Sequence, residues 1–187
     1  GVLALQGDVR EHLAMLRTLG ADALAVRTAA QVGDVDALVI PGGESSVIDR
    51  LSRILGLRDP LRRRIAEGMP VLGTCAGLIL LADRILDAAP GQQTLGGLDV
   101  TVRRNAFGSQ VDSFESTVAI DAIGERPVAA SFIRAPVVEE VGADVAVLGR
   151  HDGRIVAVEQ GARIGIAFHP ELAGDDRLHR RLLDRVG

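Results

Sequence analysis

The sequence is poor in aromatic residues: among its 187 residues there are four Phe and no Trp or Tyr. The hydrophobic core must therefore consist of aliphatic side chains, which is typical of buried parallel strands covered by helices. The chain is long enough to bury a substantial core and short enough to form one domain. We therefore predict a single domain that spans residues 1–187.

The sequence also has no excess of positive charge. It carries 21 Lys and Arg residues against 25 Asp and Glu residues, and its net charge is −4. A nucleic-acid-binding protein needs a basic surface that neutralises phosphates, so we expect no nucleic-acid partner. Two arginine-rich stretches, 61–68 and 177–185, have Leu and Ile at helical spacing. We interpret both as solvated helix faces, with contact to a partner protein as the alternative.

Long apolar runs are missing as well, and none approaches the roughly 20 residues that a membrane-spanning helix needs. Cys75 is the one cysteine, so no internal disulfide can form and nothing indicates secretion. The first residues read as a strand rather than as a signal peptide. Because Gly1 is not an initiator Met, we expect a few residues to precede it. These absences predict a cytoplasmic protein with no membrane partner.

Short apolar segments alternate with helical patterns in the first part of the chain. Asp8 is placed to cap the first helix, whereas Gly56 and Pro60 interrupt the helical stretch at 47–68. This alternation predicts an α/β fold with a doubly wound, mostly parallel sheet and flanking helices. The predicted strands are 1–6, 22–26, 36–40 and 70–74.

The rest of the chain has a different pattern. Between residues 91 and 148, short apolar runs are separated by frequent turn residues, which favours added antiparallel strands. Residues 153–168 read as a hairpin around Gly161, and its second strand should be central in the sheet. The segment 175–186 has Leu and Val four residues apart and predicts a closing helix.

Cys75 lies in the segment GTCAG, between an apolar strand and a helical pattern. A sharp turn at this junction would lift the thiol above the carboxyl end of the sheet, where open α/β sheets place their sites. The helix start favours a thiolate, and the small neighbours let a substrate approach. The segment therefore predicts a nucleophile elbow, with a small buried hydrophobic residue as the alternative.

A second segment, FHPEL, follows the predicted central strand. In extended backbone, His169 and Glu171 point to the same side, and Pro170 stiffens the link between them. A thiol nucleophile requires an imidazole base that a third group orients. We therefore predict that both residues act with Cys75. The alternative is a surface loop with an incidental His and Glu.

The segment PGGESS follows the third predicted strand. Its glycine pair permits a backbone conformation that other residues disfavour, so one of its N–H groups could join that of Ala76 in an oxyanion hole. A tight turn without function is the alternative. A phosphate-binding loop is disfavoured because the lysine of that motif is missing. We find no metal-ligand spacing, and we expect His12 and His179 on solvated helix faces.

Together these segments resemble the class I, or triad, glutamine amidotransferases, to whose nucleophile and His-x-Glu motifs GTCAG and FHPE are similar. The sequence resembles more specifically the glutaminase subunits of two-subunit pyridoxal 5′-phosphate synthases. RNAFGSQVDSFE is the most specific motif, because general amidotransferase domains do not share it. Ser46 departs from the family pattern, which usually has Thr, but keeps the hydroxyl. The motifs that carry the resemblance are LALQGDVREH, PGGESS, GTCAGLILLA, RRNAFGSQVDSFE, FIRAP and FHPEL.

The resemblance implies a reaction. Cys75 would attack the side-chain amide carbon of L-glutamine, and His169 would pass the thiol proton to the leaving ammonia. Glu171 would orient His169, and the backbone N–H groups of Gly43 and Ala76 would hold the oxyanion. Water would then hydrolyse the thioester and release L-glutamate. The resemblance implies no cofactor and no metal.

The resemblance also implies a binding site and a partner. An anion and a cation near the pocket suit the α-ammonium and α-carboxylate of glutamine. The ammonia would pass to a (β/α)₈-barrel synthase subunit within a large hetero-oligomer, and the segment LQGDVREH could contact that partner. The positions that would hold glutamine are Gly43, Glu44, Ser45, Arg104, Ile133 and Arg134.

Three other functions stay open at this point. The chain could be the glutaminase subunit of another amidotransferase pathway, which the segment RNAFGSQVDSFE disfavours. It could be a non-catalytic regulatory subunit on the same fold, although no triad position is missing. It could also be an isolated cysteine hydrolase that needs no partner.

Overall fold

The fold is organised around parallel strands. The computed structural model describes residues 1–106 and 113–186. Within these residues one sheet has the strand order β2-β1-β3-β4-β12-β11-β9-β6-β5, with β10 beside β11. The first five strands of this order pair in parallel, which confirms the predicted α/β core. They are β2 (Ala25–Val26), β1 (Val2–Leu3), β3 (Leu38–Ile40), β4 (Val71–Thr74) and β12 (Arg163–Ile166).

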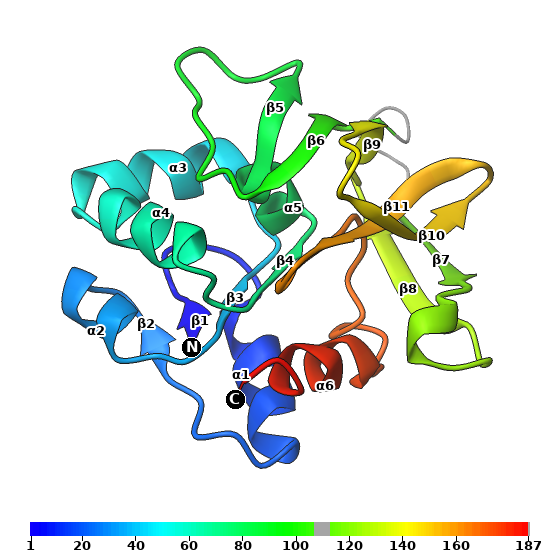
Figure 1. Cartoon of the computed structure of the whole chain (residues 1–187), viewed down its shortest axis with the longest axis horizontal. Helices are drawn as coiled ribbons and strands as arrows, with labels where there is room; N and C mark the ends of the chain where they lie inside the picture. Colours follow the sequence, from blue (N-terminus) through cyan, green and yellow to red (C-terminus); the bar gives the residue numbers. More distant parts are fainter. Residues whose placement is uncertain (107–112, 187) are drawn as a thin grey trace.

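Helices flank these strands, as the alternating pattern predicted. Figure 1 shows α1 and α6 side by side below the parallel strands, with α3 and α4 on the opposite side. The short α5 follows β4 directly and packs against it. The helices are α1 (Val9–Thr18), α2 (Ala29–Gly33), α3 (Ser45–Ile54), α4 (Arg58–Ala66), α5 (Ala76–Leu81) and α6 (Arg177–Leu183).

The predicted break in the helical stretch 47–68 is confirmed at Gly56, which has a φ of 71° between α3 and α4. Pro60 does not interrupt the stretch. It lies in the first turn of α4, where a backbone N–H has no helical partner and a proline is tolerated. Sequence reasoning missed α2, although Thr28 and Gln31 form a capping box at its start.

The second half of the sheet is mostly antiparallel, as predicted. The strand β11 pairs with β12 in the expected hairpin, and Gly161 in its turn has a φ of 59°. However, β5 was not predicted, and it pairs with β6 in parallel. Its sequence, ADRIL, continues the apolar run of α5 and has no strand alternation. The strands are β5 (Ala82–Leu86), β6 (Leu98–Arg103), β9 (Val137–Val141), β10 (Ala146–His151) and β11 (Arg154–Gln160).

A separate two-stranded ribbon lies beside this half of the sheet. It pairs β7 (Ser113–Val118) with β8 (Val128–Ile133), and the 3₁₀ turn η1 (Asp121–Ile123) follows β7. An isolated bridge joins Ser131 of β8 to His169. The ribbon therefore connects directly to one of the predicted catalytic residues.

The core is aliphatic, as the scarcity of aromatic residues predicted, and Phe132 and Phe168 are its large aromatic members. On α6, Leu178 and Leu182 are buried as expected.

The arginine-rich stretches are only partly solvated. Arg62 on α4 is exposed, but Arg181 and Arg185 contact the buried carboxylate of Glu159. The prediction of a solvated face is therefore wrong for Arg181, which is half-buried because a buried acid on β11 faces the helix, whereas Arg185 contacts the same acid and stays exposed. In the described part of the chain, no helix has the length and apolar character to cross a membrane.

Candidate active site

Cys75 occupies a strained turn between β4 and α5. Its φ is 48° and its ψ is −99°, a conformation that costs energy for a residue with a side chain. Glycines make the turn possible, because a Cβ on Gly77 would lie 2.1 Å from the Ile40 carbonyl oxygen. Figure 1 shows α5 directly after β4 in the middle of the fold. The predicted elbow geometry is therefore present, and the residue is 7% exposed.

The segment after β12 places an imidazole and a carboxylate beside the thiol. The Nδ1 of His169 lies 2.8 Å from Oε1 of Glu171, so the predicted same-side arrangement is confirmed. His169 is fixed further by its backbone N–H, which donates to the carbonyl of Ser131 at 2.9 Å. Both side chains are buried, and that of Glu171 is 0% exposed. These contacts argue against the alternative of a surface loop.

The electrostatics favour a protonated imidazole. Burial lowers the pKa of His169, but hydrogen bonds with Asp8, Cys75 and Glu171 outweigh burial and raise the pKa to about 12. Burial raises the pKa of Glu171, although the contact with His169 opposes that change. His169 therefore holds a proton that it can give to a leaving group, and its Nδ1–H donates to Glu171.

Asp8 is a second carboxylate at the same ring nitrogen. It occupies the predicted N-cap position of α1, but its side chain makes no capping hydrogen bond. Instead its Oδ2 lies 3.3 Å from Nδ1 of His169. Gly42 permits this approach, since a Cβ there would lie 2.2 Å from Cε1 of His169. No sequence signal indicated this role, because a helix cap explained Asp8 fully.

A small cavity lies beside Cys75, with a volume of about 30 Å³. All the residues predicted to bind glutamine line it. Ile79 and Asn105 line it as well and were not predicted. Asn105 and Arg134 both have positive φ angles, 49° and 45°, and such backbone strain clusters at functional sites. The lining is Gly43, Glu44, Ser45, Cys75, Ile79, Arg104, Asn105, Ile133 and Arg134.

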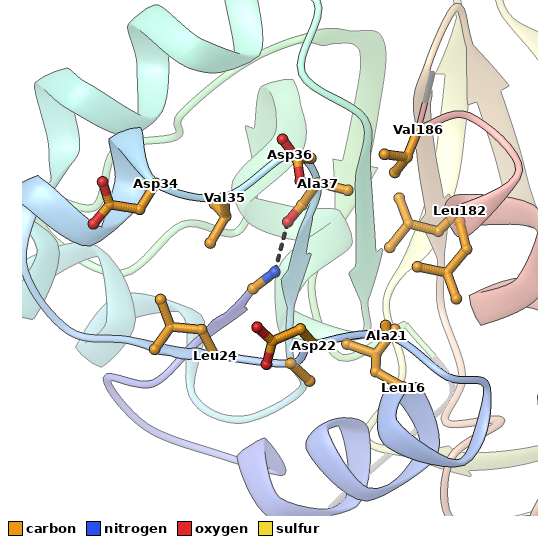
Figure 2. Close-up of a pocket in the computed structure, with 13 residues that line it drawn as sticks. Leu16, Ala21, Asp22, Leu24, Asp34, Val35, Asp36, Ala37, Leu182 and Val186 are labelled. Atoms are coloured by element: carbon orange, nitrogen blue, oxygen red, sulfur yellow. Dashed lines mark hydrogen bonds between the residues drawn. The ribbon is translucent and has the colours of Figure 1, made fainter.

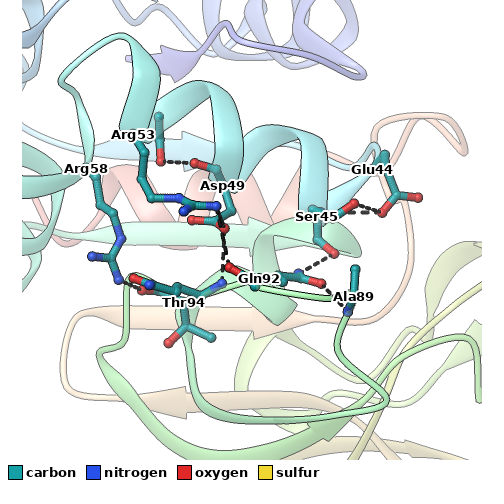
Figure 3. Close-up of polar contacts among 12 residues, drawn as sticks. Glu44, Ser45, Asp49, Arg53, Arg58, Ala89, Gln92 and Thr94 are labelled. Atoms are coloured by element: carbon teal, nitrogen blue, oxygen red, sulfur yellow. Dashed lines mark hydrogen bonds and ion pairs between the residues drawn. The ribbon is translucent and has the colours of Figure 1, made fainter.

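An ion pair crosses this cavity. The guanidinium of Arg104 donates to Oε1 of Glu44 at 2.9 Å and to Oε1 of Gln92 at 3.0 Å. Figure 3 shows Gln92 beside Ser45, to whose hydroxyl its amide nitrogen donates at 2.9 Å. Gln92 therefore orients two of the predicted residues. Sequence reasoning missed it because its loop carries no recognisable motif.

The two predicted oxyanion-hole residues come from different segments beside Cys75. Ala76 follows Cys75 at the start of α5, and Gly43 lines the cavity from the loop after β3. Gly43 has a φ of 150°, and a Cβ there would lie 2.4 Å from Oε1 of Gln6. That Gln6 oxygen accepts a hydrogen bond from the backbone N–H of Glu44 at 2.7 Å. The PGGESS loop is thus held by the segment after β1.

The prediction that His12 and His179 are solvated is wrong, since both are 0% exposed. His12 faces inward from α1, where its Nδ1 lies 2.8 Å from Nε2 of His179 on α6. Their amphipathic helices pack against each other, and the histidines fall on the packed faces. In the described ranges, one group has metal-ligand geometry, namely Asp8, His169 and Glu171. The hydrogen bond between His169 and Glu171 accounts for that geometry without a metal.

A larger hollow, of about 410 Å³, lies away from Cys75. Figure 2 shows Leu16, Leu182 and Val186 on one side of it and three aspartates elsewhere on its wall. Among the described residues that line it there is no Cys, Ser, Thr or His. The small cavity, rather than this hollow, therefore has the groups needed for covalent catalysis.

Comparison with known proteins agrees with this geometry. The model of the SNO glutamine amidotransferase family matches residues 2–186. The chain is 63% identical to "Pyridoxal 5′-phosphate synthase subunit PdxT" of Acidothermus cellulolyticus, and the alignment covers 96% of this chain and 89% of that protein. It is 61% identical to the protein of the same name from Kineococcus radiotolerans, with coverage of 100% and 93%.

Solved structures show the same likeness. A crystal structure described as a glutamine amidotransferase is 46% identical, with a TM-score of 0.91 and coverage of 98% of this chain and 96% of that one. A putative GMP synthase protein from Thermoplasma acidophilum is 15% identical, with a TM-score of 0.67 and coverage of 97% and 90%, which shows a shared fold alone. The most specific motif of the sequence lies partly outside the described residues, at 107–112.

Proposed function

Because the chain belongs to the SNO glutamine amidotransferase family, we propose that it is the glutaminase subunit of a pyridoxal 5′-phosphate synthase, acting as one domain. In this role it hydrolyses L-glutamine to L-glutamate and ammonia. The single observation that carries the proposal is the placement of Cys75 in a strained elbow beside the hydrogen-bonded pair of His169 and Glu171. The names and coverage of the PdxT relatives support the assignment to this synthase.

The first half of the reaction forms a thioester. The sulfur of Cys75 attacks the side-chain amide carbon of glutamine, and the resulting oxyanion accepts hydrogen bonds from the N–H groups of Gly43 and Ala76. The tetrahedral intermediate then collapses and the C–N bond breaks. His169 gives its proton to the nitrogen, which leaves as ammonia. Glu171 holds the imidazolium in place through Nδ1–H.

The second half restores the enzyme. A water molecule attacks the thioester carbon while His169 accepts one of its protons. The C–S bond breaks, glutamate is formed and the proton returns to the Cys75–His169 pair. Every step uses groups of the chain itself and needs no cofactor.

Recognition of glutamine follows from the ion pair in the cavity. A free amino acid brings one α-carboxylate and one α-ammonium, and Arg104 and Glu44 offer the complementary charges. Glu44 and Arg104 pair with each other across the cavity, and we expect the charged groups of glutamine to replace part of this contact. Ser45, Ile133 and Arg134 complete the walls. This arrangement suits a zwitterionic amino acid better than an internal residue of a peptide.

The ammonia would pass to a (β/α)₈-barrel synthase subunit, with which the chain forms a large hetero-oligomer. The names of the relatives as synthase subunits support such a partner. The segment after β1 lies beside the site, where Gln6 contacts the PGGESS loop and Asp8 contacts His169. A partner that binds this segment would therefore reach the catalytic groups directly.

The test is glutamate release from glutamine by the purified chain, alone and mixed with a pyridoxal 5′-phosphate synthase barrel subunit. We expect activity in the mixture, and Cys75→Ala should abolish it because the nucleophile is missing. Equal activity with and without the barrel subunit would remove the dependence on a partner but keep the glutaminase. Full activity in Cys75→Ala would overturn the nucleophile assignment.

A further inference from the structure

Two buried histidines form a pair behind the catalytic carboxylate. His12 of α1 and His179 of α6 are both 0% exposed, and Figure 1 shows these helices side by side. Nδ1 of His12 lies 2.8 Å from Nε2 of His179, and the ring centroids are 5.0 Å apart. Buried polar side chains are costly unless they are paired. The pair therefore has to be explained, and none of the proposed reaction steps uses it.

The histidine pair contacts the active site through Nε2 of His12. Nε2 of His12 lies 3.4 Å from Oε1 of Glu171 and 3.3 Å from the hydroxyl of Thr74. Thr74 immediately precedes Cys75. Oε2 of Glu171 has no hydrogen-bond partner in the described part of the chain. The orientation of this carboxylate therefore depends on the groups around Oε1, where His169 and His12 are its side-chain neighbours and a backbone N–H also contributes.

The unpaired atoms decide which nitrogens carry protons. If His12 donated from Nδ1 to His179, His179 would keep its proton on Nδ1, which is buried and has no partner among the described residues. In that arrangement Nε2 of His12 would also turn a lone pair toward Glu171. If His179 donates from Nε2 instead, its unpartnered Nδ1 is only an unused acceptor. His12 then presents Nε2–H to Thr74 and Glu171, so the second arrangement is favoured.

Both rings are neutral in this arrangement, which their surroundings support. Burial, followed by the neighbouring His179 and His169, holds the pKa of His12 well below 6.5. Burial lowers the pKa of His179 to about 4. Each ring therefore has one N–H and one lone pair near neutral pH, as a directed chain of hydrogen bonds requires.

We propose that His12 and His179 are positioning residues, in which Nε2–H of His179 donates to Nδ1 of His12 and Nε2–H of His12 faces Oε1 of Glu171. The pair thereby fixes the carboxylate that orients His169. This inference rests on the proposed glutaminase function. It adds two residues, one from each flanking helix, to the support of the catalytic triad.

The proton arrangement can be tested without any activity. Nitrogen-15 NMR of the free chain, labelled at histidine, distinguishes a protonated Nδ1 from a protonated Nε2. We expect the Nε2–H form for both residues, with signals assigned by His12→Gln and His179→Gln. A protonated Nδ1 on His12 would overturn the inference, because the lone pair would then face Glu171.

The positioning role can be tested by kinetics in the complex with the barrel subunit. His12→Leu removes the donor and should lower kcat by about 10- to 100-fold, while KM stays within about twofold because the cavity is untouched. His12→Gln keeps an N–H near the position of Nε2 and should recover most of kcat. His179→Leu should also lower kcat, by a smaller factor than His12→Leu does, and His179→Gln should again recover most of kcat.

His151→Gln is the matched control, since His151 packs against Phe132 with a ring distance of 5.0 Å and lies outside the triad. Urea unfolding of each variant establishes that the comparison is made between folded proteins. An unchanged kcat in folded His12→Leu, or an equal loss in His12→Gln, would overturn the positioning role. No glutamate release by the wild-type complex would instead contradict the proposed function, and the NMR result would still decide the proton arrangement.

Discussion

The two sides of His169 differ in their access to water. On the buried side, Glu171 lies 2.8 Å from Nδ1 with a side chain that is 0% exposed, and His12 and His179 lie behind it. On the open side, Asp8 lies 3.3 Å from the same nitrogen with a side chain that is 34% exposed. Both carboxylates raise the pKa of His169. Nδ1 of His169 therefore faces two carboxylates, the buried one of Glu171 and the partly solvated one of Asp8.

This difference in burial indicates that Glu171 and Asp8 have different roles at His169. Electrostatic interactions are stronger where water is excluded, and solvent screens a partly exposed charge. The shorter distance and the full burial assign the orientation and tautomer of the ring to Glu171, although the hydrogen bond with Asp8 raises the pKa of His169 more than that with Glu171 does. Asp8 adjusts the same charge from a position that a partner protein or salt can reach. The predictions below test this division.

The largest expected effect belongs to Glu171→Gln. The amide cannot hold Nδ1–H as a carboxylate does, so the imidazole adopts the wrong tautomer or orientation. We expect kcat for glutamate release in the complex to fall by about 10³- to 10⁴-fold. The exposed Glu125→Gln is the matched control and should retain full activity. A loss below tenfold in Glu171→Gln would place the orienting role elsewhere.

The next effect is a loss of stability in acid that comes from the buried side. The pKa of His179 is about 4 in the folded protein against 6.5 when unfolded. As the pH falls, His179 is protonated in the unfolded chain before it is protonated in the folded protein. The free energy of unfolding therefore keeps its whole contribution from neutral His179 above pH 6.5 and loses it between pH 6.5 and pH 4. The decline from this residue is roughly 3 kcal/mol.

Urea unfolding at a series of pH values measures this decline. His179→Gln removes the titrating group, so the free energy of unfolding should depend less steeply on pH over the same interval. The difference in slope should correspond to about one bound proton. Parallel curves for the wild type and His179→Gln would show that the residue titrates equally in both states.

A smaller effect is expected at the cavity. Arg104→Met removes the cation that pairs with Glu44 and faces the proposed site of the α-carboxylate. We expect kcat/KM for glutamine to fall by about 10- to 100-fold, mainly through KM, since a charged hydrogen bond to the substrate is lost. Arg62→Met on the exposed face of α4 is the control. A fall in kcat at constant KM would instead make Arg104 part of the chemistry.

The sequence allowed the locally encoded part of this site to be predicted. The Cys75 elbow depends on one strand, one turn and one helix start. The pairing of His169 with Glu171 depends on residues two apart in extended backbone. Both follow from short-range geometry, and the parallel half of the sheet followed from the same kind of local pattern.

The parts that could not be predicted depend on distant contacts. His12 and His179 are 167 positions apart in the chain, and an amphipathic helix pattern does not reveal which polar residue on its edge faces another helix. The sequence explained Asp8 as a helix cap, but in the folded protein its side chain contacts His169 instead of the start of α1. The strand β5 was missed because its parallel pairing with β6 outweighs a helix-like sequence.

The smallest expected effect is that of Asp8→Asn, and it defines the open side most directly. The change keeps the volume and removes a partly solvated charge beside Nδ1 of His169, so we expect kcat to fall by less than about tenfold. The difference from the wild type should shrink as salt is added, because ions already screen the Asp8 carboxylate. Asp144→Asn, on an exposed turn, is the control. If Asp8→Asn lost as much activity as Glu171→Gln at every salt concentration, the two carboxylates would be equivalent, and burial would not be what separates their roles.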